Sequence, residues 1–102
     1  MFIVMISTKV PEHLRGYISR FAVEVEAGVF VGKVSRAVAD RLWERGVEAT
    51  KEGRLTQIRS TSAVEQGFEI RTFGDDAPEV CEFDGLQLVA RRQLARFGEF
   101  VE

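Results

Sequence analysis

The first six residues, Met1 to Ile6, are all apolar. A continuous apolar run of this length is typical of a strand that is buried on both faces and lies in the middle of a sheet. The rest of the chain is therefore expected to supply neighbouring strands and the helices that cover them.

Two segments have the spacing of amphipathic helices. The first is predicted from Pro11 to a stop at Gly28, because proline suits the first helical turn and glycine suits the end of a helix. Its apolar residues follow helical spacing at Leu14, Tyr17, Ile18, Phe21, Ala22 and Val25. The second is predicted over about residues 36–52, between an N-cap at Ser35 and a stop at Gly53. Its apolar stripe consists of Val38, Leu42 and Ala49.

The remaining segments complete a small α+β domain. Short strands are predicted at residues 29–31, 54–61, 67–73 and 86–90. Residues 74–85 are predicted to form an acidic loop. Two helices on a small, mainly antiparallel sheet form a ferredoxin-like sandwich, here with an extra C-terminal strand. We expect this domain to cover residues 1–90, followed by a tail with helical spacing at 91–102.

Composition excludes several classes of protein. A chain of 102 residues supports one domain, and 45% hydrophobic residues are ordinary for a globular protein. The net charge of −2 argues against a generally basic, DNA-coating surface but leaves room for a local basic patch. Cys81 and His13 are each the single residue of their type, which excludes an internal disulfide and a multi-histidine metal site. No apolar run reaches 18 residues, so we expect a soluble cytoplasmic protein.

Carboxylates are poorly placed for metal catalysis. The segment after the predicted central strand reads Ser7-Thr8-Lys9, and Glu12 is the nearest acid. A favourable charge at the start of a helix explains Glu12 better than a metal site does. Five acids lie between Gly74 and Val89, namely Asp75, Asp76, Glu79, Glu82 and Asp84. A segment of this kind is either a cation ligand or, as we favour, a flexible acidic loop or one that meets a basic protein.

Several stretches of the chain together resemble one family. They are Val10-Pro11, Leu14-Arg15-Gly16, Glu24 to Gly32, Val34-Ser35, Trp43, Glu65 to Gly74 and Asp84-Gly85-Leu86. The chain resembles the small universal CRISPR-associated adaptation protein, the second of the two numbered adaptation proteins, in its subtype I-E form. The resemblance covers residues 1 to about 90, and the blocks EAGVFVG and GFEIRTFG are its most specific parts.

The resemblance implies a ferredoxin-like homodimer that bridges two dimers of the larger adaptation protein, which is the integrase. The assembly holds a piece of double-stranded DNA and inserts it as a new spacer into the CRISPR array. The integrase performs the strand transfer, whereas the small protein acts as scaffold and DNA platform. No cofactor is then required, and Mg²⁺ matters only if the chain is a nuclease.

The resemblance also implies DNA-binding residues. Arg15 corresponds to a family cation that touches the DNA backbone, and His13 stands where the family can have a second arginine. Lys9 stands at a polar position near the DNA. From the residues alone, these three form a small anion-friendly corner, with a plain solvated face as the other interpretation.

Partner-binding residues are expected at the other end of the chain. Glu65 and Asp84 match family acids that meet the integrase. Glu82 belongs to the acidic segment, and Leu86 and Leu88 belong to the following strand. Together they suit docking on a basic protein by strand addition.

A metal-dependent endoribonuclease or endodeoxyribonuclease is the alternative function. Some family members are described as nucleases that use an acid at the end of the first strand. Thr8 occupies that place here. We therefore expect no catalytic residue, unless Glu12 or the acidic segment replaces the missing acid.

Overall fold

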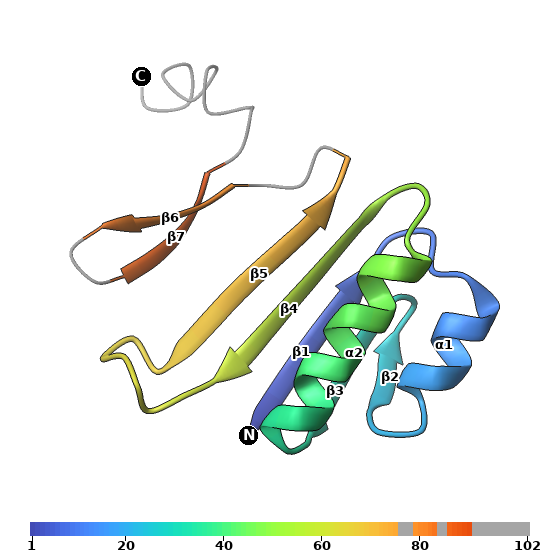
Figure 1. Cartoon of the computed structure of the whole chain (residues 1–102), viewed down its shortest axis with the longest axis horizontal. Coiled ribbons are helices and arrows are strands. Elements are labelled where there is room, and N and C mark those ends of the chain that lie inside the picture. The colour runs from blue at the N-terminus through green and yellow to red at the C-terminus, as the bar shows by residue number, and fades with distance from the viewer. Residues whose placement is uncertain (76–78, 84–85, 91–102) are drawn as a thin grey trace.

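The chain folds as two helices on one face of an antiparallel sheet (Figure 1). The computed structural model describes residues 1–75, 79–83 and 86–90. The elements are β1 (Phe2–Ser7), α1 (Glu12–Ile18), β2 (Val23–Glu26), β3 (Val29–Lys33), α2 (Arg36–Ala49), β4 (Arg54–Ser60), β5 (Phe68–Gly74), β6 (Glu79–Phe83) and β7 (Leu86–Ala90). Five strands form the main sheet in the order β2-β3-β1-β4-β5, and β6 and β7 form a second sheet. The predicted ferredoxin-like class is confirmed.

Strand β1 occupies the centre of the main sheet, between β3 and β4, as its apolar run predicts. Ile3 and Met5 are fully buried beneath the helices. Phe2 is 51% exposed and Ile6 is 37% exposed on the opposite face. The expectation that this strand is buried on both faces is therefore not met by the described residues, because both of their helices lie on the other face of the sheet.

The first helix is shorter than predicted. It ends at Ile18, and residues Val23–Glu26 form β2 instead of continuing it. The Val-Glu-Val-Glu alternation matches the two-residue period of a strand, and its valines favour strand geometry. Gly28 does not stop a helix but turns the chain from β2 into β3 at φ +79°, where a Cβ would collide with the Ser7 carbonyl oxygen.

The second helix begins as predicted. The Ser35 hydroxyl accepts a hydrogen bond of 3.2 Å from the amide of Val38, which satisfies a free donor of the first turn. The helix ends at Ala49, about three residues before the predicted end at residue 52. Thr50 adopts an extended backbone, and its hydroxyl donates to the Gly46 carbonyl at 2.7 Å.

The core lies between the main sheet and the two helices. Its fully or nearly buried members are Ile3, Met5, Leu14, Ile18, Ala22, Phe30, Ala39, Leu42 and Leu55. Two polar residues of β4, Gln57 and Arg59, are buried beside this core under α2. No helix in the described ranges is long and apolar enough to span a membrane.

The C-terminal segment differs most from expectation. Residues 74–85 are not one loop, because Glu79–Phe83 form β6, which pairs with the predicted strand β7. Valine, cysteine and phenylalanine within this acidic segment give it enough strand character to pair. The strands β4 and β5 lie within about one residue of their predicted bounds. The tail predicted at 91–102 lies outside the described residues.

Gln87 fastens β7 to the edge of β5. Its side-chain oxygen accepts from the Ile70 amide at 2.8 Å, and its side-chain nitrogen donates to the Ile70 carbonyl at 3.4 Å. Gln66 bonds the backbone of Gln87 in the same reciprocal way, at 2.7 and 3.0 Å. The two glutamine amides thus take the place of backbone pairing between the two sheets.

Candidate nucleic-acid and partner interfaces

Thr8 and Lys9 form the corner between β1 and α1. The Thr8 hydroxyl accepts from the Arg54 amide at 2.7 Å, and the Thr8 amide donates to the Arg54 carbonyl at 3.0 Å. Thr8 therefore ties the end of the central strand to β4. Lys9 is exposed, and its Nζ lies 3.4 Å from Glu52 Oε2, so its charge is partly offset by a carboxylate of the same chain.

Arg15 joins α1 to strand β2. Its Nε lies 3.4 Å from Glu24 Oε2, and its Nη1 lies 3.4 Å from Glu12 Oε1. The same Glu24 oxygen accepts the Gly28 amide at 2.9 Å, so this carboxylate is fixed by the β2–β3 turn. Two acids of the chain therefore share the charge of Arg15, which leaves less of it for an external anion.

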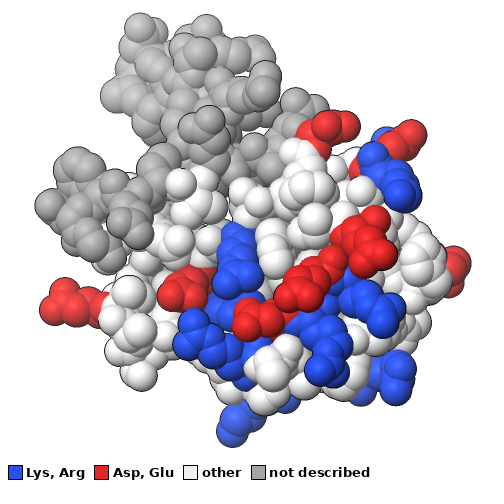
Figure 2. All heavy atoms as spheres, in the orientation of Figure 1, with Lys and Arg blue, Asp and Glu red and all other residues white. Residues whose placement is uncertain are grey.

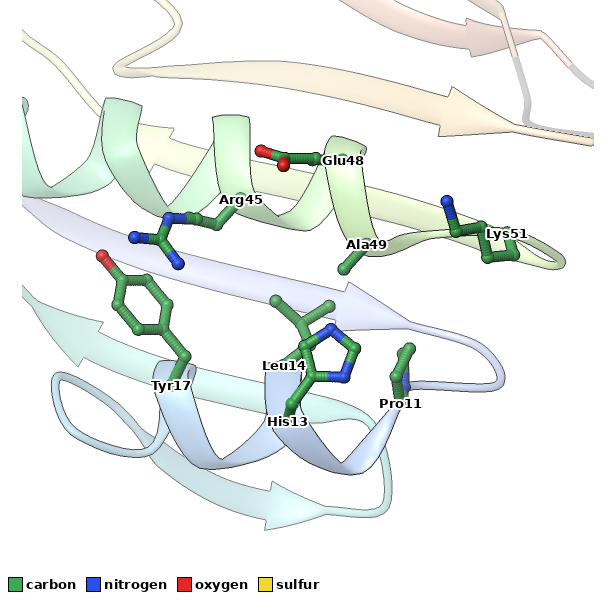
Figure 3. A pocket seen from close by; sticks show the side chains of 8 residues that line it. All are labelled: Pro11, His13, Leu14, Tyr17, Arg45, Glu48, Ala49 and Lys51. Carbon is green, nitrogen blue, oxygen red and sulfur yellow. The ribbon is translucent and has the colours of Figure 1, made fainter.

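His13 lies in a hollow of about 450 Å³ between α1 and α2. The lining residues are Pro11, His13, Leu14, Tyr17, Arg45, Glu48, Ala49 and Lys51. Figure 3 shows His13 and Tyr17 of α1 pointing toward α2, and Arg45 of α2 pointing toward Tyr17. The Arg45 guanidinium carbon lies 4.9 Å from the centre of the Tyr17 ring, a favourable cation–π distance.

The three predicted DNA-binding residues do not form one cluster. His13 and Arg15 are two residues apart in α1, so they lie on different sides of it. His13 lines the hollow, Arg15 is held by Glu24 and Glu12, and Lys9 pairs with Glu52. Basic and acidic side chains interleave on the face shown in Figure 2, so no uniform basic field covers it.

Sequence reasoning did not identify Arg45 and Lys51 as members of this surface. Both are exposed, and in the described part of the chain neither forms an ion pair. Arg45 lies in α2, and Lys51 follows it by two residues. The sequence shows only that the second helix carries mixed charges. The packing of α1 beside α2 is what places Arg45 and Lys51 around His13.

The predicted partner-binding residues that the structure describes lie around β7 and the turn before β5. Leu86 and Leu88 of β7 are 41% and 48% exposed. Glu65 is exposed in the turn before β5, next to the Gln66 that bonds β7. The backbone of Glu82 in β6 pairs with β7, whereas its side chain and Asp84 lie outside the described parts.

The open face of the main sheet carries an apolar row across all five strands. The register aligns Val23 with Val31, Val31 with Val4, Val4 with Ile58, and Ile58 with Ile70. Val23 is 67% exposed at one end of this row. An apolar face of this kind, which no helix of the described residues covers, is typical of an interaction surface.

A metal-dependent nuclease needs several metal ligands at one place. Within the described residues, no group of three or more His, Cys, Asp or Glu side chains is placed to hold a metal ion. Glu12, the acid considered as a catalytic replacement, is exposed and contacts Arg15.

The model of the CRISPR-associated protein family (Cas_Cas2CT1978) matches residues 2–88. The chain belongs to this family. The resemblance expected from the sequence blocks is thus confirmed at the level of a Cas2-like protein with a role in CRISPR systems. Its subtype I-E form stays a prediction.

Proposed function

We propose that this Cas2-like protein is the homodimeric scaffold of CRISPR spacer acquisition, which bridges dimers of the integrase and contacts the DNA backbone. The open face of the main sheet is the observation that carries the proposal. A bridging subunit needs one surface for its own copy and another for its partner. The apolar row on the sheet and the exposed leucines of β7 are two such surfaces, formed by different residues.

The homodimer is supported by the chemistry of the open face. Phe2, Ile6 and Val23 expose apolar surface there, and Val25 of β2 is 57% exposed. Burial of such surface stabilises association by roughly 25 cal/mol for each Å² removed from water. A two-fold dimer uses the same face on both copies, so one apolar sheet face is enough to form it.

The integrase contact is supported by β7 and the turn before β5. Leu86 and Leu88 project apolar side chains from one strand, and Glu65 adds a negative charge close by. Exposed strands recognise partners by backbone pairing, and alternate side chains then give specificity. An acidic and apolar surface fits a partner that is basic because it also binds DNA.

The scaffold role is favoured over metal-dependent cleavage because of Thr8. Thr8 stands where the resemblance puts the catalytic acid of the nucleases. Its hydroxyl accepts a hydrogen bond from the Arg54 amide. The scaffold requires no cofactor of its own, and Mg²⁺ would serve only a nuclease.

Array growth in cells tests the proposal. Cells that carry the integrase and a repeat array should gain spacers with the wild-type chain and with Glu12→Gln, but not without the chain. Array growth in the absence of the chain would contradict the scaffold role. Failure of Glu12→Gln alone, with normal protein level and assembly, would favour the nuclease.

A further inference from the structure

The hollow between α1 and α2 combines cations from two elements in a way that the predicted DNA residues do not account for. Lys9 and Arg15 each contact a carboxylate of their own chain at 3.4 Å. Arg45 and Lys51 line the hollow without an ion pair to any described residue. The free positive charge in this region therefore lies on the α2 side of the hollow.

The geometry points to this hollow as a binding site for the sugar–phosphate backbone of duplex DNA, with Arg45 and Lys51 as its principal contacts. This inference rests on the proposed function, because it names the surface through which the scaffold touches DNA. It assigns the main DNA contacts to the second helix and the residues just after it, whereas the sequence directs attention to α1.

Arg45 is arranged to receive a phosphate. Its guanidinium packs against the ring of Tyr17, which restricts the side chain before any ligand arrives. A restricted arginine loses less conformational entropy on binding than a free one, and its planar donors match phosphate oxygens. The Tyr17 hydroxyl adds a further donor group at the same side of the hollow.

The two cations flank the hollow from opposite ends. Figure 3 shows Arg45 beside Tyr17 at one end, His13 between, and Lys51 at the other end. Arg45 lies in α2, whereas Lys51 lies two residues beyond Ala49, the last residue of the helix. Separate positive charges along one hollow suit a strand that carries one phosphate on each nucleotide.

Glu48 is the one acid of the lining, and it weakens but does not cancel this charge. Figure 3 shows its carboxylate on the side of α2 away from His13 and Tyr17. The two permanent cations thus outnumber the acid, while Pro11, Leu14 and Ala49 form an apolar base. The hollow thus offers separate positive charges above an apolar base. This combination suits a chain of phosphates better than a carboxylate-rich protein.

Salt-dependent binding of the homodimer to a duplex of about 30 base pairs tests the inference. The logarithm of the association constant falls linearly as the logarithm of the salt concentration rises. Each lost phosphate contact makes this negative slope shallower by about 0.9. Arg45→Gln and Lys51→Gln should each make the slope shallower by about this amount for every protomer that touches DNA. Arg36→Gln removes an exposed arginine at the other end of α2 and should leave the slope unchanged.

Each outcome separates the hollow from the wider proposal. If the wild-type protein binds the duplex and Arg36→Gln weakens this binding as much as Arg45→Gln does, the hollow is not the binding site. DNA binding by the scaffold would still stand in that case. If the wild-type protein binds no duplex at low salt or in the integrase assembly, the proposed function itself fails. Thermal unfolding of the variants verifies that they are folded. A shift of the Arg45 Nε–Hε resonance on DNA addition, larger than that of Arg36, supports the hollow directly.

Discussion

Arg59 of β4 and Asp40 of α2 form an ion pair in which only one partner reaches solvent. Arg59 Nη1 lies 2.8 Å from Asp40 Oδ1, and the arginine side chain is 1% exposed whereas the aspartate is 42% exposed. Gln57 accepts from Arg59 Nε at 3.1 Å and donates to the Ala39 carbonyl at 2.9 Å. A buried guanidinium is thus satisfied by groups that also fasten α2 to the sheet.

Loss of this ion pair should destabilise the fold. Asp40→Asn leaves the buried guanidinium of Arg59 with a weaker partner, so the free energy of unfolding should fall by about 1–3 kcal/mol. Urea denaturation measures this change. Asp75→Asn, at an exposed position after β5, is the control and should have no comparable effect. Equal effects of the two substitutions would contradict the role assigned to Arg59.

The same pair predicts how stability changes with acid. The hydrogen bond from Arg59 lowers the pKa of Asp40 below its ordinary value of 3.8. A lowered pKa favours the charged native form, so its stabilisation is present above that value and is lost as the pH falls below it. Asp40→Asn should therefore lose less stability than wild-type protein between about pH 5 and about pH 2. Parallel curves for the two proteins would show that the pair contributes nothing to acid denaturation.

The open sheet face should control the homodimer. Val23 is largely exposed in the single chain, so Val23→Arg should preserve the fold while its charge opposes burial between two apolar faces. Sedimentation equilibrium should then give the mass of one 11.5 kDa chain instead of two. Val64→Arg, in the turn before β5, makes the same chemical change elsewhere and should remain dimeric. A dimeric Val23→Arg variant would move the interface away from this face.

The glutamine contacts should hold the β6–β7 hairpin in place. Gln87→Ala removes the acceptor of the Ile70 amide at the edge of β5. Hydrogen exchange at this amide should become faster, whereas exchange at the amides of β1 should be unchanged because the sheet centre is untouched. Unaltered exchange at Ile70 would mean that the hairpin is held by other contacts.

Several parts of the fold follow directly from local sequence. The apolar run of β1 places it at the centre of the sheet, and Ser35 marks the start of α2. The β2 strand is harder to predict, because Val25 continues the helical spacing of α1 as well as the alternation of a strand. Tertiary pairing with β3 decides between these periods, and a local pattern does not contain that information.

The sites depend still more on packing. Gln57 and Arg59 are polar residues on either side of the apolar Ile58 in β4, a pattern that would place them toward water, yet α2 covers them and supplies Asp40. Arg45 and Lys51 look like ordinary charges of a solvated helix until α1 is placed beside them. For DNA binding, the family resemblance directs attention to Lys9 and to His13 and Arg15 of α1, since it transfers roles position by position.

The stoichiometry of the assembly tests the scaffold role most directly. Native mass spectrometry of this chain with the integrase and duplex DNA should show two copies of the chain together with two integrase dimers. Leu88→Arg should abolish this species and leave the homodimer intact, because Leu88 lies on β7, which belongs to the second sheet and not to the main sheet. A wild-type assembly that contains one copy of the chain, or none, would contradict the account.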